Sequence, residues 1–110
     1  MTVEDITSEF SFNTEIINTA MRFKVYKIAS MIMCIFYASF SKNVSALSCK
    51  IIDIPTKYRP VYSTDFIGIS LPDGSLLHCL ASQTGGVTTS NSIINNKSAN
   101  GISFSCIYIL

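Results

Sequence analysis

Phe66-Ile-Gly-Ile-Ser-Leu71, Pro72-Asp73-Gly74 and Ser75-Leu-Leu-His-Cys-Leu80 are the three consecutive segments that best predict the fold of this 110-residue chain. Two apolar runs flank a Pro-Asp-Gly turn, in which proline presets φ and glycine accepts a positive φ. These segments therefore predict a β-hairpin.

The sequence on both sides of this hairpin favours further strands. Residues 49–54 are rich in β-branched side chains and end at Pro55, which predicts a short strand. Residues 102–109 alternate loosely and predict a final strand, whereas residues 82–101 are rich in Ser, Thr, Asn and Gly and predict a long polar loop with a short strand at Ile93–Ile94. The expected fold class is α+β, mainly antiparallel β, in a small domain at residues 47–110.

Charge divides the chain into three stretches. Residues 1–20 carry four acidic and no basic side chains, residues 21–46 carry four basic and no acidic ones, and residues 47–110 carry four basic and three acidic ones. The whole chain has a formal net charge of +1, which gives no electrostatic argument for a nucleic-acid binder.

Residues 21–46 have the order of a secretory signal peptide. A basic start at 21–27 precedes thirteen uncharged residues at 28–40, and Val44-Ser45-Ala46 predicts cleavage after Ala46. As a helix the apolar run would rise only about 20 Å, which is less than a bilayer core of about 30 Å. We therefore expect a secreted, extracellular product without stable membrane association after cleavage. The alternatives are an uncleaved type II membrane anchor that starts near Val25, or a buried core helix.

Residues 1–20 form an acidic leader in front of this signal. Because Met21 stands where an initiator would, we expect translation to start there. The Ile6/Phe10 and Ile16/Ile17 spacing leaves open a short amphipathic helix.

Cysteines are expected to stabilise the mature segment, which is too small to rely on apolar burial alone. Cys49 and Cys106 would close the largest loop, and an oxidising compartment permits that disulfide. Cys79 is then left as a buried thiol or as the site of an intermolecular bond, and Cys34 is removed with the signal.

Other candidate sites are few. Asn96-Lys97-Ser98 is an N-glycosylation sequon in the polar loop. Cys49, His78, Cys79 and Cys106 lack the spacing of a zinc site, so we expect neither a metal nor another cofactor.

Catalysis would have to use His78, Arg59 and an aspartate such as Asp65. RNA transesterification needs a base, an acid and a cation, which these three residue types could supply. The simpler interpretation is an exposed strand histidine and a solvated turn arginine, which we favour.

Two short motifs resemble fungal ribonucleases. Tyr62-Ser63-Thr64-Asp65-Phe66 looks like the Tyr-Ser-Ser-Asp stretch that opens the helix of guanyl-specific fungal ribonucleases, and residues 98–106 look like their closing turn and final cysteine. The chain thus resembles the secreted ribonuclease-like candidate effectors of powdery mildew fungi, whose early and late cysteines form a disulfide. The resemblance implies a trimmed ribonuclease-like fold with a helix after Asp65, which competes with the hairpin. No glutamate follows residue 46, which implies a catalytically dead relative.

The resulting functional hypothesis is a secreted, non-catalytic fungal effector that binds a host or extracellular protein, with RNA as a second partner class. The alternatives are a secreted ribonuclease and a small type II membrane-anchored protein.

Overall fold

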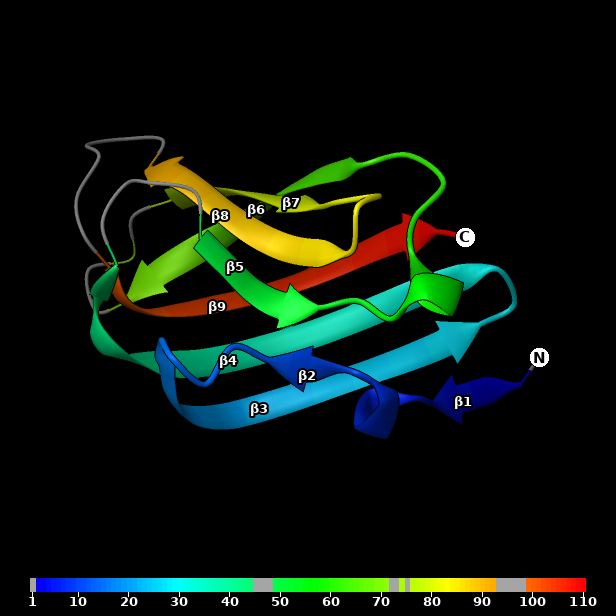
Figure 1. The fold of residues 1–110 in the computed structure, drawn as a ribbon, viewed down its shortest axis with the longest axis horizontal. Coiled ribbons are helices and arrows are strands. Elements are labelled where there is room, and N and C mark those ends of the chain that lie inside the picture. Colours follow the sequence, from blue (N-terminus) through cyan, green and yellow to red (C-terminus); the bar gives the residue numbers. More distant parts are fainter. Residues whose placement is uncertain (1, 45–48, 72–73, 75, 93–98) are drawn as a thin grey trace.

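One antiparallel sheet runs through the whole chain. The computed structural model describes residues 2–44, 49–71, 74, 76–92 and 99–110. Its nine strands lie in the order β1-β3-β4-β9-β6-β7-β8-β5-β2, and the sheet curls into a half-barrel (Figure 1). The strands are β1 (Val3–Asp5), β2 (Ser11–Phe12), β3 (Ile17–Ile28), β4 (Met31–Val44), β5 (Cys49–Asp53), β6 (Thr64–Leu71), β7 (Leu76–Ala81), β8 (Gly86–Ser92) and β9 (Ala99–Ile109).

The predicted hairpin is confirmed. Strands β6 and β7 pair antiparallel from Thr64↔Ala81 to Ile69↔Leu76. Gly74, in the connection between them, has the expected positive φ of 77°.

The strands predicted at residues 49–54 and 102–109 are also confirmed, but the prediction of a polar loop at residues 82–101 is wrong in part. Strand β5 begins at Cys49, and β9 extends the expected strand backwards to Ala99. Strand β8 occupies Gly86–Ser92 within the segment expected to be a loop. Its Val87, Thr88 and Thr89 are β-branched, and this preference for extended backbone outweighs their mixed polarity. The short strand expected at Ile93–Ile94 falls outside the described residues.

The segment expected to be a signal peptide forms most of the central β3–β4 hairpin. Residues at even positions of β4 point into the core, with Ile32 and Ala38 fully buried. Residues at odd positions, such as Met33 and Ile35, are half-buried on the outer face. Because both faces of β4 are apolar, its sequence reads as one continuous hydrophobic run.

The acidic leader packs against the rest of the sheet instead of forming a helix. It contains β1, the 3-10 turn η1 (Thr7–Glu9) and β2, and its Ile6, Phe10, Ile16 and Ile17 are all buried. A second 3-10 turn, η2 (Thr56–Tyr58), holds η1 in place. The Tyr58 hydroxyl donates to Glu9 Oε2 at 2.9 Å, and the Phe10 and Tyr58 rings stack at 5.7 Å.

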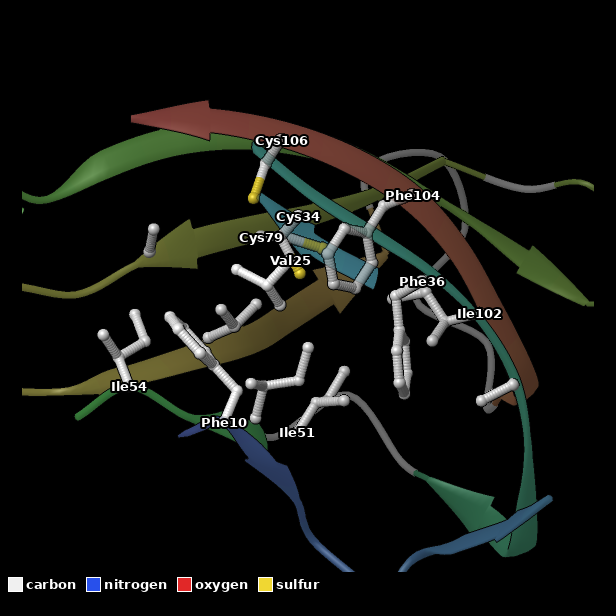
Figure 2. Packing of buried hydrophobic residues seen from close by; sticks show 14 of the residues in the cluster. Phe10, Val25, Cys34, Phe36, Ile51, Ile54, Cys79, Ile102, Phe104 and Cys106 are labelled. Carbon is white, nitrogen blue, oxygen red and sulfur yellow. The ribbon is translucent and has the colours of Figure 1, made fainter. Parts of the chain in front are cut away.

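The core lies inside the curl of the sheet and contains a row of aromatic rings. Successive ring centroids are 5.6, 5.5, 5.5 and 4.9 Å apart from Phe12 through Phe23, Phe36 and Phe104 to Phe66. Figure 2 shows Phe36 and Phe104 beside Ile102, with three cysteines further along the core. This row joins strands from both ends of the sequence into one core.

The expected fold class is therefore corrected. The fold is nearly all antiparallel β, and it contains no α-helix among the described residues. In the full-length chain, strands from both halves of the sequence share one sheet. The helix that the ribonuclease resemblance places after Asp65 is replaced by β6, because alternating isoleucines pair with β7. None of the described helical segments is long and apolar enough to cross a membrane.

Candidate functional site

The structure brings two of the three proposed catalytic residues together. On the outer face of the β6–β7 hairpin, His78 Nε2 lies 2.6 Å from Asp65 Oδ1. An ionised carboxylate can only accept, so the imidazole ring donates this hydrogen bond. Both side chains are largely solvent-exposed, at 44% for His78 and 69% for Asp65. A histidine–aspartate pair of this kind can transfer one proton to or from a bound molecule.

Arg59 has a different role from the one its sequence position suggested. It directly follows η2, and its guanidinium lies against Gly85 in the β7–β8 turn, where a Cβ atom would come within 2.6 Å of Arg59 Nε. Gly85 has a φ of 109°, so its backbone conformation favours glycine. Arg59 therefore packs on a turn, and no described contact links it to His78 or Asp65.

The expected disulfide between Cys49 and Cys106 is wrong. Cys106 is a free, buried thiol, and the residue directly opposite it in the β4–β9 ladder is Cys34. Cys49 begins β5, which pairs with β8 and lies four strands away from β9 in the sheet order. Cys34 lies in the segment predicted to be a cleaved signal, so the predicted pairing did not include this cross-strand neighbour of Cys106.

Cys34 and Cys79 are poor nucleophiles. The pKa of Cys34 is raised well above its usual value, first by the hydrogen bond between its thiol and that of Cys106 and then by burial. Burial raises the pKa of Cys79 to about 12. Because the thiolate is the reactive form, this environment suppresses cysteine catalysis.

The predicted glycosylation site lies in a part of the chain that the structure does not describe. Asn96 lies outside the described residues. Within the ranges that are described, no three His, Cys, Asp or Glu side chains are grouped as a metal site would require.

Sequence reasoning missed a groove along the outer side of β9. Strands β6 and β9 pair only from Leu71↔Gly101 to Ile69↔Ser103, although β6 reaches back to Thr64 and β9 continues to Ile109. The two strands run at an angle to each other in Figure 1. We call the depression along this open stretch the β9 groove; it consists of two hollows.

The first hollow of the β9 groove has a volume of about 310 Å³. It combines isoleucine side chains with two serine hydroxyls and one guanidinium, and its lining comprises Arg22, Ile35, Phe36, Ile67, Ile69, Ser103, Phe104 and Ser105. Arg22 makes no ion pair with any residue in the described part of the chain. His78 lies beside this hollow, because it pairs directly with Ile67.

The second hollow has a volume of about 430 Å³ and is mostly apolar. Its lining comprises Val61, Tyr62, Thr64, Ile107, Tyr108 and Ile109. A backbone hydrogen bond from Val61 N to Ile109 O, 3.2 Å long, joins its two sides. Odd-numbered residues of β9 line both hollows, so the two hollows lie one after the other along about 20 Å of the strand, from Ser103 to Ile109.

One sequence signal could have indicated this surface. Ile107 and Ile109 lie on the outer face and are 49% and 56% exposed, while the intervening Tyr108 is buried. A strand that is apolar on both faces needs a partner on each, and residues 28–40 have the same property.

The Asp65–His78 pair alone does not make up the set of groups that the sequence proposed for RNA cleavage. Asp65 and His78 supply one acid–base pair, whereas transesterification needs a second proton-transfer group and a cation at the phosphorane. Arg59, the cation that the sequence proposed, packs on Gly85 instead.

Comparison with known proteins gives no family assignment. The sequence matches no family model, and it matches no curated protein at a significant level.

Proposed function

We propose that this chain is a non-catalytic binding module that holds an extended apolar segment of a partner protein in the β9 groove. The observation that carries the proposal is that the β6–β9 ladder ends at Ile69↔Ser103 while two hollows continue along β9. Extended peptides commonly bind alongside strands, where main-chain hydrogen bonds give affinity and side-chain hollows give specificity. A groove of about 20 Å fits about six residues in extended conformation.

The lining of the groove selects the chemistry of this segment. Isoleucines and Tyr62 provide apolar surface, and Ser103 and Ser105 add hydroxyls that can donate to or accept from a peptide backbone. Arg22 lies at the end formed by the first hollow and favours a carboxylate there. We therefore propose an apolar peptide with an acidic residue at one end.

Ion pairing of three lysines with acidic side chains favours a protein partner over RNA. Lys24, Lys50 and Lys57 contact Asp5, Asp53 and Glu9. These pairs neutralise side chains that a polyanion would need as a basic stripe. The proposed partner class is thus a protein, as in the sequence-based hypothesis of an effector that binds a host or extracellular protein.

The lining of the β9 groove indicates whether the full-length or the cleaved chain would bind the partner. Arg22 and Ile35 line it, and cleavage after Ala46 would remove both. We propose that the binding form retains residues 1–46, so secretion through cleavage of this segment becomes the competing proposal. Intact mass of the product from a eukaryotic secretion host separates the two. A full-length mass supports retention, and a species starting at Leu47 contradicts it.

The peptide proposal is tested by selection from a phage-displayed library of random peptides of about seven residues against the full-length chain. We expect enrichment of apolar peptides with one terminal Asp or Glu. Affinity of the synthesised consensus peptide should fall at least tenfold on Ile109→Asp, because a carboxylate would replace apolar surface in the second hollow.

Val3→Asp is the matched control. Val3 is 58% exposed, close to the 56% of Ile109, and lies on β1 outside both hollows. Its substitution should leave affinity unchanged. Arg22→Gln should weaken the acidic peptide but not its Glu→Gln analogue. Absence of enrichment, equal loss in both Asp variants, or tight binding of an oligouridylate instead would overturn the proposal.

A further inference from the structure

Cys34 and Cys106 form a pair of thiols that the proposed binding function does not use. They are direct partners in the β4–β9 ladder, and their side chains are 2% and 4% exposed. Figure 2 shows both among the buried side chains of the core, near Cys79 and Val25. Two thiol groups thus face each other inside the fold, on strands from opposite halves of the chain.

The register places these two residues at the separation that a disulfide needs. Met31↔Ile109 is the last pair of the ladder, and one step further Leu110 N donates to Ser30 O at 2.8 Å. Even-numbered positions of β9 therefore exchange hydrogen bonds with β4, and Cys34↔Cys106 belongs to this class. Such pairs have Cα atoms about 5.5 Å apart, within the range of about 4.4–6.8 Å found for disulfides.

Cys79 has no such neighbour. It is 1% exposed and lies on β7, where its ladder partners are Phe66 on β6 and Thr89 on β8. It matches the other two cysteines in burial but not in register, which makes it a control within the same core.

We propose that Cys34 and Cys106 are a thiol–disulfide modification site, which a low-molecular-weight disulfide such as glutathione disulfide converts into a covalent bond between β4 and β9. One protein thiol loses its proton and attacks a sulfur of glutathione disulfide, releasing the first glutathione thiolate and leaving a mixed disulfide. The second protein thiol then loses its proton and attacks the protein sulfur of that mixed disulfide, releasing the second glutathione. The two protons protonate the two thiolates, so two protein thiols are oxidised and one glutathione disulfide is reduced to two glutathiones.

Burial makes this reaction depend on opening of the fold. The reduced pair is buried, so oxidation should be slow in the native state and fast where the β4–β9 ladder opens. Once formed, the bond would link residues from the two halves of the chain and limit the unfolded ensemble. The oxidised chain should melt at least about 5 °C above the reduced chain.

The test uses the full-length chain, reduced and then incubated with oxidised glutathione with and without urea near the unfolding midpoint. Trypsin separates the four cysteines, since Cys34, Cys49, Cys79 and Cys106 fall in residues 28–42, 43–50, 58–97 and 98–110. We expect a loss of two hydrogens in the intact mass and a disulfide-linked peptide that joins 28–42 to 98–110. This mapping needs no variant and therefore does not depend on the folding of one.

Variants then assign the effect to the pair. Cys79→Ser should keep the linked peptide and the rise in Tm, and Cys34→Ser or Cys106→Ser should abolish both. A linked peptide that joins 98–110 to 43–50 or to 58–97 would overturn the proposal, as would free thiols at Cys34 and Cys106 after oxidation at the unfolding midpoint. A negative result in this disulfide mapping would leave the peptide-binding proposal unaffected, because the peptide experiment measures affinity at the β9 groove and not the oxidation of Cys34 and Cys106.

Discussion

Ala29 is the one non-glycine residue with a positive φ among the described residues, at 54°. It occupies the first position of the two-residue turn between Ile28 and Met31, where glycine is preferred. A positive φ at alanine costs the folded state about 1 kcal/mol. Glycine removes this cost, but it also has more conformational entropy in the unfolded chain, which offsets part of the gain. We expect Ala29→Gly to raise the free energy of unfolding by about 0.5 kcal/mol in urea denaturation.

Ala38→Gly provides the comparison for that variant. Ala38 is fully buried within β4, so glycine there should lower stability by at least about 0.5 kcal/mol. A loss of stability in both variants would contradict the strained turn.

At Gly68 the structure favours glycine because there is little space for a side chain, and not because of its backbone conformation. A Cβ atom there would lie 3.0 Å from Cys79 Sγ and 3.1 Å from Ile102 Cδ1. We expect Gly68→Val to lower the free energy of unfolding by about 1–3 kcal/mol, since the core would be overpacked. Adding Cys79→Ala should recover part of this loss in the same urea measurement, and a double variant with purely additive losses would contradict the steric cause.

At the scale of elements, an acidic side chain ties the leader to the second half of the chain. Glu9 in η1 accepts from the Tyr58 hydroxyl, and its Oε1 lies 2.6 Å from Lys57 Nζ in η2. The pKa of Glu9 is lowered, first by the hydrogen bond from Lys57 and then by that from Tyr58. A carboxyl with a lowered pKa stabilises the fold above its unfolded pKa near 4.5, and this contribution disappears as the pH falls through the lower folded value.

Glu9→Gln should therefore flatten the dependence of the urea midpoint on pH between about pH 5 and about pH 3. The effect should be small because the pair is solvent-screened. Glu4→Gln removes the same charge from β1, where Glu4 makes no ion pair with a described residue, and should keep the slope of the wild-type chain. Identical slopes for Glu9→Gln and wild type would contradict the proposed link.

Local signals predicted some elements and failed for others. The 66–80 hairpin was predictable because a Pro-Asp-Gly turn and two apolar runs act over short sequence distances. Residues 28–40 fit two interpretations, because β4 is apolar on both faces and an apolar run of that length also suits a signal peptide. The β9 groove was not predictable, since it arises where two strands distant in sequence separate.

At the scale of the whole molecule, both halves of the chain contribute to one core. Strand β4 pairs with β9 from Met31↔Ile109 to Ser39↔Gly101, and the buried side chains of β9 pack on those of β4. We expect a fragment of residues 47–110 to lack cooperative unfolding, because it would lose four of the nine described strands and expose the inner side of β9. Circular dichroism during heating and the amide dispersion of a proton–nitrogen NMR spectrum measure this.

The full-length chain under the same conditions is the control for that fragment. A fragment with a sharp thermal transition and dispersed amides would contradict the single shared core. It would also strengthen the alternative in which residues 21–46 are removed as a signal.

The sequence by itself determined the local structure. Turn chemistry and β-branched composition placed the β6–β7 hairpin and strands β5 and β9, because those preferences act within a few residues. Only the tertiary structure decided that β3 and β4 complete the sheet, that Cys34 rather than Cys49 faces Cys106, and that a groove follows β9. These features depend on pairing between distant segments, and one sequence does not specify which apolar run lies beside which.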